Sequence, residues 1–361
     1  MHLKHLSLQN FRNYKRTSFN FSENTTLVVG PNTAGKSNLI EAIFFMARGG
    51  SFRIDKDEQL VKFGEEVARI KGKLGDKDLE VLIAKEGVGG RITPFKKYLV
   101  NGVNKRKVDF VGNFFAVLFA PNDLEIIVGS PGERRGFINN ILIQTDRDYR
   151  LAMTFYEKGL RMRNALLHRA QETGARSEKE FAYWDNLLIV QGQKITKKRE
   201  EFIDYLRISR KEILNFEIFY DKSIISKDRL LQYKDAEVGA GVTLVGPHRD
   251  DLIIRIYPNK INANESESVD IRYFGSRGQQ RLAVLQLKIL ELAYVEKTTG
   301  ERPVLLLDDI FSELDEKHIS LVLDQTLQRL GYGGQAIITT THREFVGKEL
   351  LKDLNVIELK K

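Results

Sequence analysis

The chain has 361 residues, with 57 Lys and Arg against 49 Asp and Glu, a formal net charge of +8, and no cysteine. The missing thiols exclude a disulfide scaffold, a thiolate zinc site and a cysteine nucleophile, and they fit a reducing interior. The length allows two or three structural units, and 42% hydrophobic residues are enough to form a buried core. No apolar run approaches the length of a membrane span, so we expect a cytoplasmic protein.

Residues 1–120 have the character of a β-rich segment. Apolar and polar residues alternate in the stretches 5–14, 68–74 and 78–85, and glycine-containing turns punctuate the segment. Within this segment the apolar run 27–29 meets a turn that ends in Gly35, Lys36 and Ser37. A new apolar pattern at helical spacing follows, so we expect the turn to connect a strand with a helix.

This turn matches the P-loop pattern, Gly30-x-x-x-x-Gly35-Lys36-Ser37. Its glycines allow backbone N–H groups to close around phosphate oxygens, and the positive end of the following helix adds to the attraction. We expect Lys36 to reach the β- and γ-phosphates of a nucleotide and Ser37 to ligate Mg²⁺. The segment expected at the nucleotide comprises Gly30, Pro31, Asn32, Thr33, Ala34, Gly35, Lys36, Ser37 and Asn38.

From about residue 133 to residue 215 the sequence predicts helices. Apolar residues at helical spacing suit one long helix from 151 to 167 and a second from 184 to 206. The polar stretch 171–180 between them indicates a turn, so we expect a helical hairpin inserted as an arm into a host domain. The predicted boundaries place the host domain at 1–120 and 236–361 and the arm at 121–235.

After the arm, strand and helix patterns alternate. Strand character returns at 242–258, a helix is expected over 278–297, and the apolar run 304–307 suits a central parallel strand. A further buried strand is expected in the stretch that ends at His342. The order of these elements predicts an α/β core that the arm divides in sequence.

Three positions near these elements are candidates for chemistry. Asp308 follows the run 304–307, at the sheet edge where ligands bind in α/β proteins, and we expect it to hold Mg²⁺. Asp309 would lie beside the attacking water as its base or orienter, although an aspartate pair can also cap the next turn. Ser276 precedes a helix and could hold phosphate with the nearby N–H groups, or could form only a cap.

The motif order is similar to that of ABC-type ATPases: the P-loop, SRGQQ (276–280), VLLLDD (304–309), SELD (312–315) and TTTH (339–342). Within them the chain resembles the RecF family of bacterial recombinational repair proteins, which is related to SMC-type chromosome ATPases. The more specific stretches are LFAPNDLEIIVGSPGERRGFIN (118–139) and VGPHRDDL (245–252). The resemblance implies an α/β fold: an ABC-type ATPase head, with a mixed or parallel sheet, that carries an inserted α-helical arm.

The resemblance also implies that ATP and Mg²⁺ bind between two copies of the chain, as a homodimer. One copy would contribute the P-loop, Asp308 and Asp309, and the other would offer a signature loop to the γ-phosphate. The signature residues are Ser276, Gly278 and Gln279. Asp309 stands where most ABC ATPases carry glutamate, and its shorter side chain predicts slow hydrolysis.

Other site residues are implied by the resemblance alone. Asp315 resembles the D-loop residue at the seam between the two copies. His342 resembles the switch histidine that senses the γ-phosphate, although it could instead be a polar residue at a strand end. Arg12 and Asn13 resemble nucleotide contacts of SMC-type heads, or could belong to a surface turn.

RecF-like proteins bind DNA with ATP, favour duplex next to single-stranded gaps, and help to place RecA there with RecR and RecO. The resemblance therefore implies a weak, DNA-stimulated ATPase that acts as a switch in recombinational repair, replication and the SOS response. The net charge of +8 favours such polyanionic partners. The candidate DNA contacts, each of which could instead be a solvated face, are Lys105, Arg106, Lys107, Lys197, Lys198 and Arg199.

Three rival functions stay open at this point. A transporter-type ATP motor would need a membrane partner, and the distance in sequence from Ser37 to Ser276 is long for that class. An SMC-type ATPase that bridges DNA would need sustained heptads, which the arm lacks. A nucleotide-regulated scaffold would bind ATP without contacting DNA itself.

Overall fold

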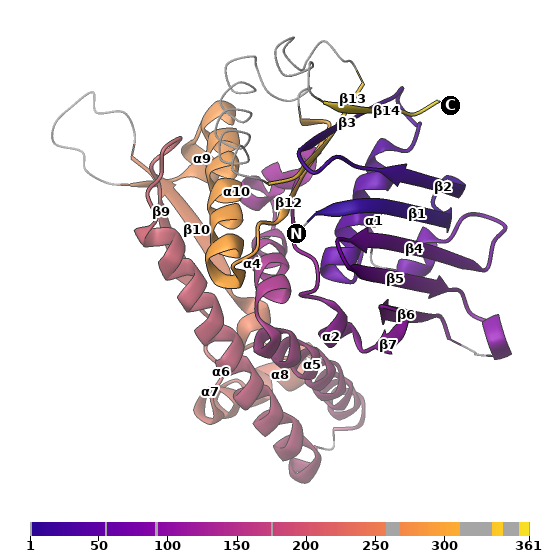
Figure 1. Cartoon of the computed structure of the whole chain (residues 1–361). Helices are drawn as coiled ribbons and strands as arrows, with labels where there is room; N and C mark the ends of the chain where they lie inside the picture. Colours follow the sequence, from indigo (N-terminus) through magenta and orange to yellow (C-terminus); the bar gives the residue numbers. More distant parts are fainter. Residues whose placement is uncertain are drawn as a thin grey trace. The chain divides into compact units, whose positions relative to one another are not determined.

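The computed structural model describes residues 2–54, 56–90, 93–174, 176–257, 268–310, 334–341 and 354–360. These residues belong to two compact units, Met1–Asp123 with Glu291–Lys361 and Leu124–Leu290. Figure 1 follows the chain through both units. Asp315 and His342 lie outside the described residues, so their expected roles stay predictions.

An antiparallel sheet of six strands forms one layer of the first unit, in the order β2-β1-β4-β5-β6-β7 (Figure 1). Alternating burial along the strands points one face into the core and the other to solvent, as the alternating sequence predicts. The strands are β1 (Leu3–Phe11), β2 (Tyr14–Asn20), β4 (Val67–Leu74), β5 (Lys77–Ala84), β6 (Phe95–Val100) and β7 (Val103–Lys105).

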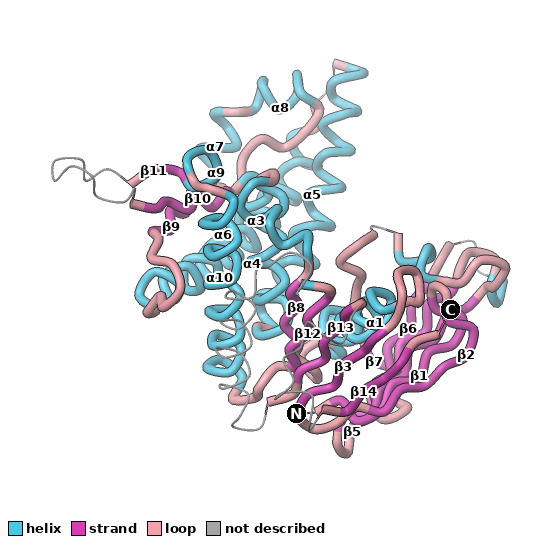
Figure 2. Tube along the Cα trace, turned by 90° about the horizontal axis from the view of Figure 1, so that it is seen from above, coloured by secondary structure: helices cyan, strands magenta, loops and turns pink. Residues whose placement is uncertain are grey.

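A parallel sheet forms the second layer of this unit, in the order β14-β3-β13-β12-β8 (Figure 2). The strands are β3 (Thr25–Val29), β8 (Ala116–Phe119), β12 (Val304–Asp308), β13 (Ala336–Thr340) and β14 (Asn355–Glu358). Every residue of β8, β12 and β13 is buried, because other elements cover both faces of the sheet. Helix α1 (Lys36–Arg48) contacts strands of both sheets and fills the space between them.

The second unit contains the helical hairpin. Helix α5 (Arg147–Thr173) packs against α6 (Glu178–Ile208), and both helices run into the stretch 171–180, so the connection is shorter than the sequence suggests. Asp146 caps α5 by accepting a hydrogen bond from the Tyr149 N–H, and Gly174 ends it with a left-handed φ of 69°. The expected pair of long antiparallel helices is therefore present.

A small sheet and several helices complete the second unit. The sheet has the order β11-β10-β9, and helix α10 begins in this unit and continues into the first. The strands are β9 (Glu217–Asp221), β10 (Asp251–Ile256) and β11 (Val269–Asp270). The helices are α3 (Glu125–Val128), α4 (Pro131–Thr145), α7 (Lys227–Gln232), α8 (Lys234–Ala240), α9 (Ile271–Phe274) and α10 (Arg277–Thr299), and the first unit adds α2 (Lys107–Phe110). Four short 3₁₀ turns, Asp57–Leu60, Val88–Gly90, Pro121–Leu124 and Pro247–Arg249, are further described elements.

Two sequence expectations differ from these elements. The strand expected over 242–258 is confined to β10, because Gly246 at φ 125° and the 3₁₀ turn that follows interrupt extended backbone. The unit boundaries fall after 123 and 290 rather than after 120 and 235. The second boundary lies later because β10 pairs with β9 and contacts α4, which keeps this segment with the arm helices.

None of the helices in the described ranges could cross a membrane.

Candidate nucleotide-binding site

The P-loop connects β3 to α1 in the first unit, as its sequence predicts. Gly35 has a φ of 104° and Thr33 a φ of 75°, so the loop twice takes left-handed backbone, once at a residue that is not glycine. A Cβ at Gly35 would lie 2.6 Å from Asn13 Nδ2, and one at Gly30 would lie 2.9 Å from Leu359 Cβ. The left-handed backbone at Gly35 and the close approach of Leu359 to Gly30 therefore explain the two glycines of the loop.

Lys36 begins helix α1 and is folded over the loop. Its Nζ donates to Gly30 O at 2.7 Å and to Pro31 O at 3.1 Å. Burial lowers the pKa of Lys36, and the negative charges of Asp309 and Asp308 oppose that shift. The Lys36 ammonium is therefore bonded to the loop carbonyls and also interacts electrostatically with the two aspartates.

Ser37 and Asp308, 271 residues apart in sequence, meet at the edge of the parallel sheet. The Ser37 hydroxyl donates to Asp308 Oδ1 at 3.0 Å, and the hydroxyl of Thr339 on β13 donates to the same oxygen at 2.8 Å. Asp309 follows with a φ of 49°, and its N–H donates to Thr339 Oγ1 at 3.1 Å. A carboxylate and a hydroxyl beside a phosphate loop are the hard oxygen ligands that suit Mg²⁺.

Asn13 and Asn38 join the loop to the turn between β1 and β2. Asn38 Nδ2 donates to Asn13 Oδ1 at 2.8 Å, and Asn13 Nδ2 donates to Ala34 O at 3.3 Å. The Tyr14 hydroxyl donates to Gly35 O at 2.9 Å, and burial raises the pKa of Tyr14. The expected contacts Asn13 and Asn38 are thus brought together at the end of the P-loop.

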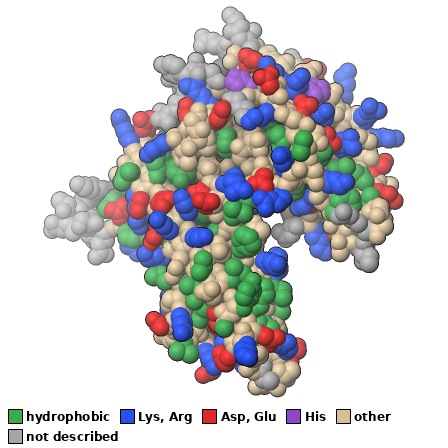
Figure 3. Space-filling model, turned by 60° about the horizontal axis from the view of Figure 1, so that its bottom comes forward, with side chains coloured by type: hydrophobic (Ala, Val, Ile, Leu, Met, Phe, Trp, Pro, Cys, Tyr) green, Lys and Arg blue, Asp and Glu red, His purple; other side chains and the backbone are tan. Residues whose placement is uncertain are grey.

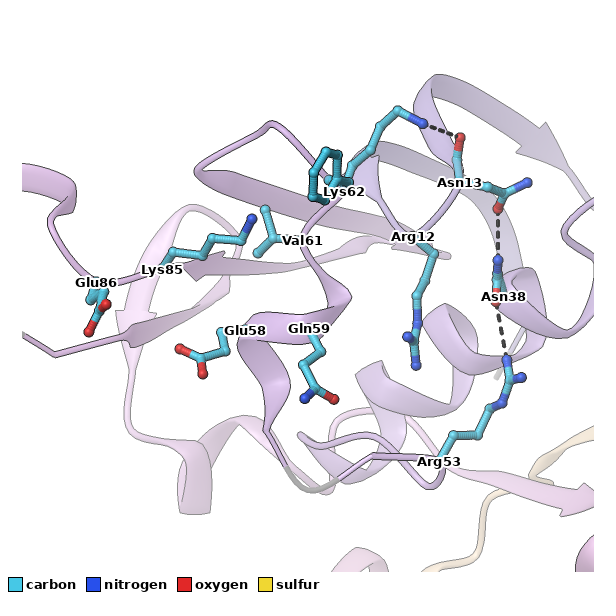
Figure 4. Close-up of a pocket in the computed structure, with 11 residues that line it drawn as sticks. Arg12, Asn13, Asn38, Arg53, Glu58, Gln59, Val61, Lys62, Lys85 and Glu86 are labelled. Carbon is cyan, nitrogen blue, oxygen red and sulfur yellow. Dashed lines mark hydrogen bonds between the residues drawn. The ribbon is translucent and has the colours of Figure 1, made fainter.

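An open pocket of about 770 Å³ adjoins these two asparagines (Figure 4). Its rim carries several cations and one fully exposed aromatic ring, Phe63. Lys62 Nζ donates to Asn13 O at 3.0 Å, which ties the rim to the P-loop side of the pocket (Figure 4). The lining residues are Arg12, Asn13, Asn38, Arg53, Glu58, Gln59, Val61, Lys62, Phe63, Lys85 and Glu86.

A second open pocket, of about 520 Å³, lies on the other flank of the loop. Pro31 and Asn32 line it, together with the C-terminal residues Glu358 and Leu359. Both expected loop residues therefore face accessible space. Leu359 N–H donates to Val29 O at 2.8 Å, so β14 fixes the entrance to the loop.

The candidate signature loop belongs to the second unit and is already folded. The Gln279 N–H donates to Ser276 Oγ at 3.2 Å, and the Ser276 N–H donates to Gln279 Oε1 at 2.9 Å, which is a capping box at the start of α10. Ser276 and Gly278 are exposed, and the rings of Tyr273 and Phe274 just before them are 73% and 72% exposed. Ser276 therefore caps α10, and because it is exposed the N-terminus of this helix stays accessible to another molecule.

The candidate DNA contacts separate into exposed and buried groups. Lys105, Arg106 and Lys107 are exposed at the end of β7 and the start of α2, and Arg106 pairs with Asp109 at 2.8 Å. Lys197 is exposed on α6. On the face of the molecule in Figure 3, basic and acidic side chains are interspersed.

Arg199 was expected to be an exposed DNA contact, but the structure buries it. Its side chain is 2% exposed, and Nη1 donates to Asp250 Oδ2 at 2.8 Å and to Pro247 O at 2.7 Å. Lys198 is held by Asp146 at 2.9 Å and Glu201 at 3.3 Å. Of the three consecutive charges 197–199 on α6, Lys197 is exposed, Lys198 is partly buried and Arg199 is buried.

Several residues of the site belong to no recognisable sequence motif. Thr339 holds Asp308, and Arg53 and Lys62 line the pocket beside Asn38 and Asn13. Glu41 could have been noticed as a carboxylate on the apolar face of α1, where a charge needs a partner. The others depend on contacts between residues far apart in sequence.

Known proteins resemble this chain over almost its whole length. Residues 2–357 match the family model described as RecF/RecN/SMC N terminal domain. The chain is 33% identical over 386 residues to the DNA replication and repair protein RecF of Bacillus cereus, which covers 99% of this chain and 97% of that relative. It is 34% identical over 386 residues to the protein of the same name from an Exiguobacterium species, covering 100% of this chain and 98% of the relative.

Solved structures of RecF proteins also resemble this chain. A structure of the recombination mediator protein RecF-ATPrS in the RecFOR pathway has a TM-score of 0.82 at 33% identity and covers 96% of this chain and 94% of its own. The RecF-ATP structure has a TM-score of 0.83 at 31% identity, covering 99% and 95%. An Smc head domain from Pyrococcus furiosus, at 16% identity and a TM-score of 0.52, shares the fold. The predicted α/β fold of an ABC-type ATPase head is confirmed.

Proposed function

Because the chain belongs to the RecF family of DNA replication and repair proteins, we propose that it is an ATP-dependent DNA-binding switch of recombinational repair. The main support for ATPase activity is the hydrogen bond from the Ser37 hydroxyl to Asp308 Oδ1 at 3.0 Å, next to Lys36 and the P-loop. This arrangement gathers a phosphate cradle, a cation and oxygen ligands for a metal at one sheet edge. Related RecF structures hold ATP or ATPrS.

Each residue at this edge has a proposed role. The loop N–H groups and Lys36 bind the β- and γ-phosphates. Ser37 and Asp308 would hold Mg²⁺, which would supply positive charge beside the phosphates. Asp309 orients the attacking water. Its side chain is shorter than the glutamate found at this place in most ABC ATPases, so hydrolysis is slow and resets the switch rather than driving a fast reaction.

The pocket beside Asn13 and Asn38 is the proposed nucleoside subsite. It adjoins the end of the P-loop, where the sugar and base of a nucleotide would leave the phosphate cradle. Phe63 offers an exposed ring for a base to stack on, and Arg12 and Lys62 offer positive charge. The pocket is open to solvent, which fits a site that a second molecule completes.

The second molecule is a further copy of the chain. Ser276 and the N-terminus of α10 are exposed and preorganised by the capping box, so they can accept a γ-phosphate held by the partner's P-loop. ATP then joins two copies, whereas ADP lacks the group that this loop binds. Asp315 and His342 are proposed at the same seam.

DNA is the proposed ligand of the assembled dimer, at junctions between duplex and single strand. Lys105, Arg106, Lys107 and Lys197 are the exposed candidates, and contacts of this kind bind phosphates without reading the sequence. Since related structures are described as mediators in the RecFOR pathway, we propose RecR and RecO as partners that, with this protein, load RecA and so support SOS induction.

Sedimentation with ATP and Mg²⁺ tests the assembly. The natural chain is expected to dimerise with ATP, and Lys36→Ala to remain monomeric because it no longer holds the nucleotide. Ser276→Arg should retain ATP binding and lose the dimer, since a bulky cation replaces the small group at the seam. Ser177→Arg, the same change at the exposed start of α6, is the matched control and should dimerise. A dimer of Ser276→Arg as stable as the natural one would refute the cross-subunit site.

A further inference from the structure

Glu41 is a buried carboxylate beside the nucleoside pocket. It lies on α1 five residues after Lys36, and its side chain has no exposed surface. A buried charge is tolerated only where partners compensate for the lost water. Glu41 therefore needs a set of donors, and two of those that surround it belong to the wall of the pocket.

Arg12 supplies a two-pronged contact. Its Nε donates to Glu41 Oε2 at 2.9 Å and its Nη2 donates to Glu41 Oε1 at 2.8 Å. This fork fixes the plane of the guanidinium as well as its position. The Arg12 backbone is also left-handed, with a φ of 52°, and its N–H donates to Leu60 O at 2.7 Å. The Arg12 side chain is 21% exposed, so part of the held guanidinium remains accessible from the pocket.

Arg53 lies on the other side of the same carboxylate. Its Nη1 is 3.7 Å from Glu41 Oε2 and donates to Asn38 Oδ1 at 3.1 Å. Asn38 in turn donates to Asn13 (Figure 4), and Asn13 donates to the P-loop carbonyl of Ala34. The hydroxyl of Ser51, two residues before Arg53, donates to Glu41 Oε1 at 2.6 Å.

We propose that Glu41 is a positioning residue for nucleotide binding, which sets Arg12 and Arg53 at the pocket wall and joins them to the P-loop. This role rests on the proposed binding of ATP in that pocket. A carboxylate at this place fixes both cations before the nucleotide arrives, so less ordering is required on binding. Without it, Arg12 and Arg53 would lose their common anchor, and the bonds through Asn38 to Asn13 would loosen.

The Glu41→Gln substitution tests the role, because glutamine keeps the shape and removes the charge. Titration of the full chain with ATP and Mg²⁺ is expected to show a dissociation constant about tenfold higher than that of the natural chain. Arg12→Ala should weaken binding to a similar extent. Glu80→Gln is the matched control: Glu80 pairs with Arg69 at 3.3 Å on the antiparallel sheet, outside the pocket, and its variant should bind as the natural chain does.

The double variant separates positioning from a general loss of structure. If Glu41 acts through Arg12, adding Glu41→Gln to Arg12→Ala should weaken ATP binding by less than threefold more, whereas independent effects would multiply. Ser51→Ala removes one donor to Glu41 without exposing the carboxylate, and it should raise the dissociation constant for ATP twofold to threefold. This variant replaces Glu41→Gln in the test if Glu41→Gln fails to fold. Unchanged ATP binding by Glu41→Gln, or effects that multiply, would overturn the positioning role alone. A natural chain that does not bind ATP would overturn the proposed function as well.

Discussion

Buried arginines carry much of the polar organisation of the helical unit. Arg199 is bonded to Asp250, Pro247 O and Asn139, and Arg163 reaches Glu237 at 2.6 Å with neither side chain exposed. Such groups are fully paired, since an unpaired charge in this environment would cost several kcal/mol. They fix where the segment 237–251 lies against α5 and α6.

His248 is a partly buried titratable group in this network. Its Nε2 lies 3.0 Å from Thr243 O, a pure acceptor, so Nε2 carries the proton and Nδ1 accepts from the Tyr156 hydroxyl at 2.8 Å. Burial lowers the pKa of His248 to about 4, the Thr243 carbonyl opposes the shift, and the positive charges of Arg249, Arg135 and Arg163 add to it. The histidine is therefore neutral in the folded chain near pH 7.

This histidine predicts an acid-sensitive helical unit. Its folded pKa is depressed below the usual 6.5, so as pH falls from 6.5 towards 4 the unfolded state takes up the proton first and stability declines. At pH 4.5 the loss relative to pH 7 is expected to be about 2.5 kcal/mol from this group. Urea unfolding followed by Trp184 fluorescence can measure it, because the single tryptophan of the chain lies on α6.

The His248→Gln variant supplies the comparison for that measurement. Glutamine does not titrate, so its stability should fall less between pH 7 and pH 4.5 than that of the natural chain. Parallel pH profiles for the two proteins would show that His248 contributes nothing to the acid sensitivity.

At the scale of elements, the α5–α6 hairpin depends on glycines where other groups come close. A Cβ at Gly159 would lie 3.2 Å from Leu187 Cδ2, and one at Gly192 would lie 2.5 Å from Ile225 Cγ2 and 3.2 Å from Tyr156 Cε2. Glycine inside a helix normally lowers stability relative to alanine. Its presence at these two positions is explained by the close approach of neighbouring side chains.

Gly192→Ala is therefore expected to destabilise the helical unit by about 1–3 kcal/mol, because overpacking outweighs the better helix propensity of alanine. Gly136→Ala on α4 is the matched control. Nothing lies within 4 Å of a Cβ there, so that variant should be unchanged or up to about 1 kcal/mol more stable. Urea unfolding of both variants measures the difference, and equal stabilities would contradict this account of the hairpin.

At the scale of the whole molecule, the net charge of +8 is the broadest feature that favours DNA. Many of the cations are paired with carboxylates in the structure, so the total charge overstates what a polyanion could contact. Lys197 and Lys198 illustrate the point, because they are neighbours in sequence and only Lys198 is held by Asp146 and Glu201. Burial and pairing therefore rank the candidate DNA contacts.

Filter binding of gapped duplex with ATP at several salt concentrations can test this ranking. Lys197→Ala is expected to weaken binding equally for unrelated sequences and to lower the slope of log affinity against log salt by about 1. Lys198→Ala, the matched control, should change the slope by much less. Binding that is absent or insensitive to salt in the natural chain would reject direct DNA contact and favour a nucleotide-regulated scaffold.

The sequence alone determined the parts of the protein whose residue types follow from local backbone geometry. The P-loop needs glycine at 30 and 35 for steric reasons, the strand β12 is apolar throughout because both its faces are buried, and both long arm helices follow from their apolar periodicity. The same periodicity could have assigned Arg199 to the buried stripe, since it follows Ile195 by four residues and precedes Phe202 by three.

The contacts between residues far apart in sequence follow from the fold. Thr339 on β13 holds Asp308 on β12, Glu41 lies between Arg12 and Arg53, and Asp250 receives Arg199. A run of charged residues in the sequence shows which side chains are present. Which of them are paired or buried depends on strand order and helix packing. For this reason the P-loop is predictable from eight consecutive residues, whereas the partners of the buried carboxylate Glu41 are not.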